Sequence, residues 1–149
     1  METLRIPSAA IGLRHVFIRD MVLPASIGIY PHEEAHAQRV RINLDLGVED
    51  DGARQNSRIA IGKDDLSRVV DYEGVAERVR SIVKAGHVRL VETLAERIAE
   101  TCLVDKRIKL ARIRVEKLDV FPDASSAGVE IERWQPVLST PAAVDQSHP

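Results

Sequence analysis

Ten consecutive residues, from Arg39 to Val48, alternate strictly between polar and apolar side chains. The apolar positions hold Val40, Ile42, Leu44, Leu46 and Val48, and the polar positions hold Arg39, Arg41, Asn43, Asp45 and Gly47. A period of two over this length is typical of a β-strand with one buried and one solvated face. Such a strand requires partner strands at its edges and a cover for its apolar face.

Three further strands are predicted from the same kind of pattern. Apolar residues between His15 and Ile29 indicate a bent strand with Pro24 at an edge or a bulge, followed by a turn at residues 28–31. Residues 111–115 and 128–134 again alternate between apolar and charged side chains. These segments supply the partners that the central strand needs.

Two amphipathic helices lie between the second and the third strand. A polar stretch at residues 49–65, interpreted as a long loop, precedes them. The first helix is predicted to begin after Asp71, a favourable N-cap, and to end at Gly86. The second runs from about Leu90 to Val104. Both show the spacing of a buried stripe, which in the first helix contains Tyr72, Val75, Ala76, Val79, Ile82 and Val83.

The order ββααββ predicts an α+β fold. A four-stranded antiparallel sheet would carry both helices on its apolar face. The opposite face would hold mixed charges that can pair across strands, namely Arg39, Arg41, Arg112, Arg114, Asp45, Glu130 and Glu132. Because such a sheet has two open edges, we expect pairing between subunits and therefore an oligomer.

The chain of 149 residues suits one domain, which we expect at residues 13–134. Residues 1–12 would be an N-terminal extension and residues 135–149 a disordered C-terminal tail.

The 21 basic and 23 acidic residues nearly balance, which argues against nucleic acid or a membrane surface as a partner. Without an apolar run of membrane-spanning length or a signal-peptide pattern, and with Cys102 as a lone core thiol, we expect a soluble, cytoplasmic protein.

Four residues have positions that permit either a structural or a functional role. Glu92 lies in the first turn of the second helix, where a carboxylate stabilises the helix or could bind a ligand. Strict alternation places Lys117 on the apolar face. There its ammonium must reach solvent, form an ion pair or serve a chemical function with a lowered pKa, whereas a bulge would turn the side chain outward. Tyr72 is interpreted as a core residue of the helical stripe and Glu33 as a solvated residue of a charged loop.

His32-Glu33-Glu34-Ala35-His36 matches the H-E-x-x-H pattern of zinc proteases. That chemistry needs both imidazoles on one face of a buried helix and a third ligand. Only about two helical turns fit before the strand that begins near Gln38, and the extended motif is absent because Arg39 and Ile42 occupy its glycine and histidine positions. We therefore interpret the segment as a polar loop and expect no metal site.

Several short motifs between Val16 and Arg133 share the order and spacing of one enzyme family. They are Ile27-Gly28-Ile29-Tyr30 with Glu33 and Gln38, Val70-Asp71-Tyr72, Leu90 to Glu96, Val115-Glu116-Lys117 and Gly128 to Arg133. With them the chain resembles the dihydroneopterin aldolase family of folate biosynthesis. The resemblance implies the tunnelling fold, in which four subunits close their sheets into a barrel and two barrels stack as a homo-octamer with substrate between neighbouring subunits.

The resemblance also implies an activity. Members of this family are lyases that cleave 7,8-dihydroneopterin into 6-hydroxymethyl-7,8-dihydropterin and glycolaldehyde by a retro-aldol reaction. The reaction needs no cofactor, metal or Schiff base, because the dihydropterin ring accepts the electrons once N5 is protonated.

The same resemblance implies roles for individual residues. Glu92 would anchor the pterin by accepting hydrogen bonds from N3–H and the 2-amino group, and the backbone at Val91 and Val70 would hold other ring edges. Lys117 would be the general acid and base, acting through an ordered water. Tyr72 would help to move the proton of the side-chain hydroxyl, and Glu33 would complete the site.

Leu118 departs from the family pattern, in which proline often follows the active lysine. A lysine–leucine pair also resembles the related dihydroneopterin triphosphate epimerases, which re-form the broken bond at C2′, so an epimerase is one alternative. A non-catalytic pterin-binding module is another. Such a module would keep Glu92 but gives no reason for an inward Lys117.

Overall fold

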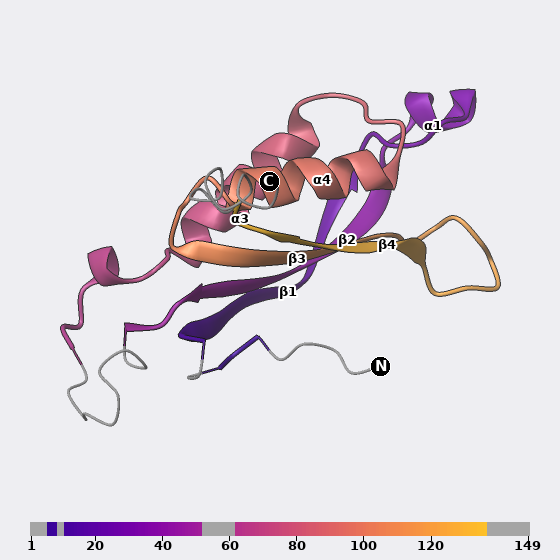
Figure 1. Ribbon diagram of the computed structural model, residues 1–149. Coiled ribbons are helices and arrows are strands. Elements are labelled where there is room, and N and C mark those ends of the chain that lie inside the picture. Colours follow the sequence, from indigo (N-terminus) through magenta and orange to yellow (C-terminus); the bar gives the residue numbers. More distant parts are fainter. Residues whose placement is uncertain (1–5, 9–10, 52–61, 137–149) are drawn as a thin grey trace, which may run out of the picture.

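The computed structural model describes residues 6–8, 11–51 and 62–136. One antiparallel sheet has the strand order β1-β2-β3-β4, and α3 and α4 cross one of its faces (Figure 1). The predicted α+β fold with order ββααββ is therefore confirmed. The elements are β1 (Leu13–Ala25), α1 (Pro31–Ala35), β2 (Gln38–Glu49), η1 (Leu66–Arg68), α3 (Tyr72–Lys84), α4 (Val91–Cys102), β3 (Ile108–Lys117) and β4 (Ala127–Trp134).

The apolar residues of the alternating strand face the helices and form the core. Ile42 and Leu44 of β2 and Ile113 of β3 are fully buried, as are Val79 of α3 and Ile98 of α4. The α4 helix packs against β3 and β4, whereas α3 packs against β1, so the two helices together cover the whole sheet. Burying each large aliphatic side chain contributes about 1.5–3 kcal/mol, which makes this layer the main source of stability.

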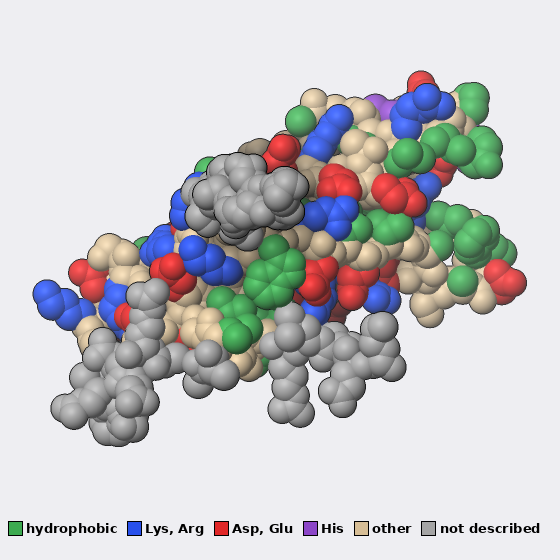
Figure 2. Space-filling view, viewed as in Figure 1, with side chains coloured by type: hydrophobic (Ala, Val, Ile, Leu, Met, Phe, Trp, Pro, Cys, Tyr) green, Lys and Arg blue, Asp and Glu red, His purple; other side chains and the backbone are tan. Residues whose placement is uncertain are grey.

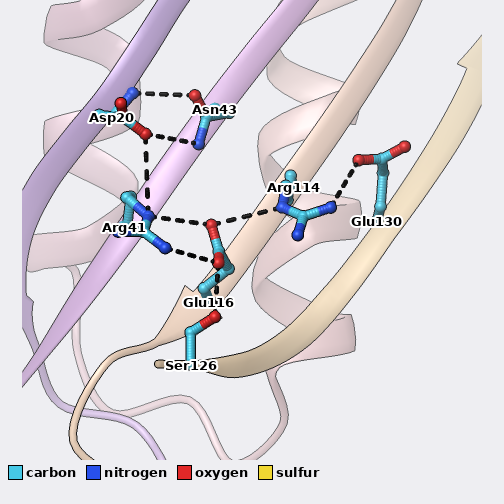
Figure 3. Close-up of polar contacts among 7 residues, drawn as sticks. All are labelled: Asp20, Arg41, Asn43, Arg114, Glu116, Ser126 and Glu130. Carbon is cyan, nitrogen blue, oxygen red and sulfur yellow. Dashed lines mark hydrogen bonds and ion pairs between the residues drawn. The ribbon is translucent and has the colours of Figure 1, made fainter. Parts of the chain in front are cut away.

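The opposite face of the sheet carries ion pairs between neighbouring strands (Figure 3). Arg41 of β2 makes two hydrogen bonds to Glu116 of β3, of 3.1 and 2.9 Å, and Arg114 of β3 lies 3.3 Å from Glu130 of β4. Glu116 is almost completely buried. Arg41 beside it lowers the pKa of Glu116 from 4.5 to about 2, against the effect of burial. The predicted cross-strand pairing of mixed charges is thus observed.

A small apolar cluster covers one end of this otherwise polar face. Ile6, Leu13 and Leu110 are buried there, and an added Cβ at Gly47 would lie within 3.4 Å of all three. Ser8 exchanges two backbone hydrogen bonds of 2.9 Å with Leu13, which holds the segment around Ile6 against the sheet. Part of the expected N-terminal extension therefore packs on the domain.

The first strand differs in detail from its prediction. It ends at Ala25, four residues before the predicted end at Ile29. Pro24 was predicted to lie either on an edge strand or at a bulge, and it lies on the edge strand β1. The irregularity in strand pairing occurs earlier in the chain, between Ile18 and Met21. Asp20 adopts a positive φ of 54° there.

The two helices begin and end close to their predicted positions. The side chain of Asp71 caps α3 by accepting from the N–H of Glu73 at 3.0 Å, and Gly86, with φ of 146°, follows its C-terminus. The interpretation of Tyr72 as a core residue is wrong, because this side chain is 64% exposed. Helical side chains point towards the N-terminus, so a first-turn residue projects beyond the core although it lies on the apolar stripe.

Within the described ranges, no helix is both long enough and apolar enough to span a membrane. The predicted loop at residues 49–65 lies mostly outside the described residues, as do most of the expected extension and the expected C-terminal tail.

Candidate functional site

A largely buried ion pair joins the short helix α1 to the end of β3. The ammonium of Lys117 donates to Oε2 of Glu33 at 2.7 Å, and the two side chains are 17% and 10% exposed. Burial of both charges is costly unless each finds good partners. Two residues 84 positions apart in the chain therefore meet in a defined geometry.

Continuous strand pairing places Lys117 in this position. It pairs with Val40 of β2 and with Ala127 of β4, and the register between β3 and β4 shows no shift from Leu110 to Lys117. The prediction that strict alternation holds up to Lys117 is correct, and the alternative of a bulge at the strand end is wrong.

The carboxylate of Glu33 is fixed by its neighbours in sequence. Its Oε1 accepts from the backbone N–H of Tyr30 at 3.2 Å, and its Oε2 accepts from the side-chain amide of Gln38 at 3.1 Å. That amide also donates to the carbonyl of Ile27 at 2.6 Å. The interpretation of Glu33 as a solvated loop residue is therefore wrong.

Gly28 is required for this arrangement. A Cβ at this position would lie 2.2 Å from Cδ of Glu33, and its φ of +138° is unfavourable for other residues. The glycine of the Ile27-Gly28-Ile29-Tyr30 motif thus makes room for the buried carboxylate. Reasoning from residue patterns did not identify this role, because a lone glycine before a turn has many simpler explanations.

The pKa of Glu33 is lowered from 4.5 to about 2. The hydrogen bond from Lys117 is the largest cause, burial acts in the opposite direction, and the bonds from Tyr30 and Gln38 lower the pKa further. Glu33 is therefore ionised at neutral pH and remains a hydrogen-bond acceptor.

A pocket of about 510 Å³ adjoins the ion pair. Glu33 lines it, and the β3–β4 connection forms part of its wall. The remaining lining residues are Tyr30, His32, His36, Ala37, Gln38, Asp119, Val120 and Phe121. The pocket combines aromatic walls with a carboxylate that holds an ammonium, which suits a small polar molecule undergoing proton transfer.

Glu92 and Val91 form the first turn of α4, beside a second pocket of about 510 Å³ lined by Ile29, Leu90 and Thr93 among others. Glu92 is exposed, and no hydrogen bond or ion pair engages it within the described part of the chain. The residues just before α4 contact the segment that supports Glu33, because the N–H of Gly28 donates to the carbonyl of Val88 at 3.0 Å.

His87 anchors this junction. Its Nε2 lies 2.8 Å from the carbonyl of Gly28, and its Nδ1 lies 2.6 Å from the hydroxyl of Ser26. The carbonyl can only accept, so Nε2 is the donor of this bond, and in the neutral ring Nδ1 accepts from the hydroxyl of Ser26. With these contacts His87 has a structural role, because it holds the segment before α4 against the glycine segment.

Val70 and Tyr72 lie at the opposite end of the sheet. Arg107, which immediately precedes β3, donates to the carbonyl of Val69 at 3.1 Å, whereas Lys117 is the last residue of that strand. At about 3.3 Å per residue, the length of β3 separates the two ends by about 30 Å. One chain therefore brings Glu33 and Lys117 together near Glu92 and Val91, but it does not bring Val70 and Tyr72 to them.

The H-E-x-x-H segment does not form a helix long enough to place its two histidines as metal ligands. The α1 helix has five residues, and His36 already has an extended conformation at its C-cap. Glu33, the residue that would serve as the base in a zinc protease, is engaged by Lys117. Among the described residues, no group of three or more potential ligands could hold a metal ion.

The family model described as FolB, dihydroneopterin aldolase, matches residues 16–132. The chain belongs to the dihydroneopterin aldolase family. Among its relatives, a dihydroneopterin aldolase of Streptomyces coelicolor is 35% identical over 104 residues, which cover 70% of this chain and 82% of the relative. A dihydroneopterin aldolase of Escherichia coli strain K12 is 30% identical over 118 residues, covering 79% and 91%.

Solved structures of the family share the fold. A dihydroneopterin aldolase from Burkholderia thailendensis bound to guanine has a TM-score of 0.70 and 31% identity, covering 87% of this chain and 98% of that one. The Escherichia coli enzyme in complex with neopterin has a TM-score of 0.69 and 29% identity, covering 80% and 98%. The subunit fold expected from the motifs, a four-stranded antiparallel sheet with helices on one face, is thereby confirmed.

The pH dependence of unfolding should report the ion pair. Because the pKa of Glu33 falls from 4.5 to about 2 on folding, its charge stabilises the native state above pH 4.5, and this contribution is lost as the pH falls towards 2. It amounts to about 3 kcal/mol. In urea unfolding at fixed protein concentration, Glu33→Gln should be less stable than wild type by about that amount at pH 7 and nearly equal to it near pH 2.

Glu34→Gln provides the matched control, because it removes an exposed carboxylate from the same short helix. This variant should keep the acid dependence of the wild type. A Glu33→Gln protein that retained the full wild-type loss of stability between pH 4.5 and 2 would contradict the assignment.

Proposed function

We propose that the chain is a dihydroneopterin aldolase that cleaves 7,8-dihydroneopterin into 6-hydroxymethyl-7,8-dihydropterin and glycolaldehyde, a lyase step of folate biosynthesis. The observation that carries this proposal is the Glu33–Lys117 pair, in which a carboxylate that lines a pocket of suitable size orients an ammonium. Membership of the family supports it, as do the relatives that carry this name.

Cleavage breaks the C1′–C2′ bond of the substrate. The 2′-hydroxyl gives up its proton as C2′ becomes the aldehyde carbon of glycolaldehyde, and the electron pair of the broken bond moves through C1′ and C6 to N5, which gains a proton. The resulting enol is then protonated at C1′ and loses the proton from N5, which restores the C6=N5 bond and gives the hydroxymethyl product. The dihydropterin ring itself accepts the electrons, so we propose a reaction without metal, cofactor or Schiff base.

Lys117 is the residue that we assign to these proton transfers. One N–H of its ammonium is held by Glu33, and the other two can donate to N5 or, through a water, to C1′. Since Glu33 stays ionised down to about pH 2, its role is to orient the ammonium. It does not supply the proton at neutral pH.

Glu92 is the residue that we assign to ring recognition. Its exposed carboxylate can accept from N3–H and the 2-amino group of the pterin in one plane, a bidentate match. The backbone N–H groups of the first turn of α4, which includes Val91, have no intrahelical acceptors and can bind further ring atoms. Both features lie next to the glycine segment that supports Glu33.

Val70 and Tyr72 complete the proposed site from a second subunit. They lie about 30 Å from Lys117 along the sheet of their own chain, further than one pterin can bridge. Tyr72 is exposed and could therefore reach a site on a neighbouring chain. There it would exchange a proton with the side-chain hydroxyl of the substrate, and the backbone at Val70 would hold a ring edge.

We further propose that the subunits form a homo-octamer in the cytoplasm. In the described chain, β1 and β4 are edge strands, so four subunits can join edge to edge into a barrel that has the helices outside. Two such barrels would stack. A cytoplasmic location agrees with the single, buried and unpaired Cys102.

Product analysis tests the proposed reaction. With 7,8-dihydroneopterin, hydroxymethyl-dihydropterin and glycolaldehyde should accumulate in equal amounts as the main products in chromatography. The epimerase is the second candidate, which Leu118 directly after Lys117 favours. An epimerase would give the C2′ epimer as its main product and release little glycolaldehyde. It would also form mainly the C2′ epimer from dihydroneopterin triphosphate.

Substitutions should separate ring recognition from proton transfer. Glu92→Ala should weaken pterin binding at least about tenfold, because it removes both acceptors of a desolvated pair. Lys117→Ala should lower kcat by a factor of about 10²–10⁴, the usual contribution of acid–base assistance, and change binding less. Calorimetry with neopterin and steady-state kinetics measure the two effects.

Glu100→Ala, an exposed glutamate of the same helix as Glu92, and Lys106→Ala, an exposed lysine, are the matched controls. Both should behave as wild type. Normal binding and turnover in Glu92→Ala and Lys117→Ala would refute the site assignment.

Mixed oligomers test whether subunits share each site. Tyr72→Phe and Lys117→Ala chains, each with low activity alone, would be co-expressed with different tags and purified through both. If the two residues come from different chains, roughly a quarter of the sites in a random 1:1 mixture regain both groups. Activity in the mixture no higher than the average of the two variants would place both residues in one chain.

A further inference from the structure

The β3–β4 connection forms one wall of the pocket beside the Glu33–Lys117 pair. It starts directly after Lys117, and its residues Asp119, Val120 and Phe121 line the same pocket as Glu33. Figure 2 shows hydrophobic side chains gathered at the tip of this connection and near α1, at the right of the view, with the surface hollowed between them. The wall therefore lies within reach of a molecule that reacts at Lys117.

An ion pair fixes the start of this wall to β2. Arg39 donates from Nε and Nη2 to the two carboxylate oxygens of Asp119, at 3.0 and 2.7 Å. The backbone N–H of Leu118 also donates to the carbonyl of Arg39 at 3.1 Å. A planar two-bond contact fixes direction as well as distance, so the chain leaves β3 at a set angle.

A second set of contacts fixes the other end of the connection. The hydroxyl of Ser126 donates to the buried carboxylate of Glu116 at 2.6 Å, and Arg41 holds that carboxylate with two further bonds (Figure 3). Between these fixed ends, Phe121 is 53% exposed, although a phenyl ring gains from burial. A ligand in the pocket would provide that burial.

The position of the wall indicates which part of the substrate it contacts. Val88, just before the first turn of α4 that we assign to the pterin ring, is hydrogen-bonded to Gly28, and the side chain of Glu33 packs against the same glycine. The connection follows Lys117 and lines the pocket of Glu33, to which no residue of α4 contributes among the described residues. With C1′ at Lys117, the wall faces the remaining carbons of the side chain.

We propose that Phe121 is a specificity-determining residue that contacts the hydroxyalkyl side chain of the substrate, and that Asp119 is a positioning residue that holds it there through Arg39. The proposal rests on the proposed function for the orientation of the ligand. The wall would then make the protein bind pterins that carry this side chain more tightly than pterins that lack it. The same wall delays the escape of glycolaldehyde after cleavage.

Binding of two ligands by the full-length protein tests the proposal. Neopterin carries the trihydroxypropyl side chain, whereas guanine offers the same amino-oxo ring edge without it. Asp119→Asn should raise the Kd of neopterin about two- to fivefold, the range that an exposed ion pair can supply. Phe121→Ala should raise it about tenfold through the loss of apolar contact. Both variants should keep the wild-type Kd for guanine in calorimetry.

Asp123→Asn is the matched control, since it removes the same charge from an exposed position of the same connection, and it should bind both ligands as wild type does. Asp119→Glu, which keeps a carboxylate for Arg39, should recover part of the neopterin affinity. An equal change for neopterin and guanine, or no change for either, would overturn the proposal.

The partition of products gives a second measurement on the same variants. A loosened wall should let glycolaldehyde leave sooner, so the ratio of C2′ epimer to hydroxymethyl product should fall about two- to fivefold in Asp119→Asn and not in Asp123→Asn. A rise of this ratio would overturn the confining role of the wall. Failure of the proposed function is seen separately, as wild-type protein that binds neopterin without consuming dihydroneopterin.

Discussion

The burial of one carboxylate beside one ammonium, at the place where α1 meets the end of β3, constrains much of the sequence around the site. A buried ion pair is stable only when its remaining hydrogen-bonding capacity is also satisfied. Glu33 meets this condition through Lys117, Gln38 and the backbone of Tyr30. Gly28 is then needed to leave the space that the carboxylate fills. The residue types in the short segment from Gly28 to Gln38 are thus determined more by the need to hold a buried charge than by secondary structure.

The same strand end carries a second buried carboxylate on the opposite face. Glu116 precedes Lys117, and alternation directs the two side chains to different sides of the sheet. The pKa of Glu116, like that of Glu33, is lowered to about 2. One pair fixes the ammonium on the apolar side, and the other ties Arg41 and Ser126 on the polar side. The backbone at Lys117 is therefore held from both faces, which favours a precise position for the group to which we assign the proton transfers.

The fold could be predicted because its signals are periodic. The alternation from Val40 to Val48 fixes one strand, its buried face and the need for a helical cover, and the cap at Asp71 and the glycine at Gly86 mark the limits of a helix. The inward position of Lys117 follows from the same alternation, carried to the strand end. Each of these inferences uses interactions between residues close in sequence.

The site could be predicted only in part, because its contacts join distant residues. Nothing in the local pattern indicates that Glu33 would meet a lysine 84 positions later, so a solvated loop was the simpler interpretation. The prediction that Tyr72 is a core residue was wrong for a different reason. Helical spacing shows the face on which a residue lies, but not whether the core extends as far as the first turn. Motif order identified both residues as candidates, whereas physical pattern alone did not.

The length of the sheet offers an explanation for the exposure of Glu92 and Tyr72. In an isolated chain, the exposed side chains of Glu92 and Tyr72 would contribute little to stability, and either could be replaced at small cost. The two lie near opposite ends of one sheet, and each end offers only part of the groups that a pterin requires. A chain that pairs its open edges with copies of itself brings unlike ends together. In the assembly that we propose, these two exposed residues are the ones that neighbouring subunits and substrate bury. The stability of the subunit and the completeness of the site would then be provided by different sets of side chains.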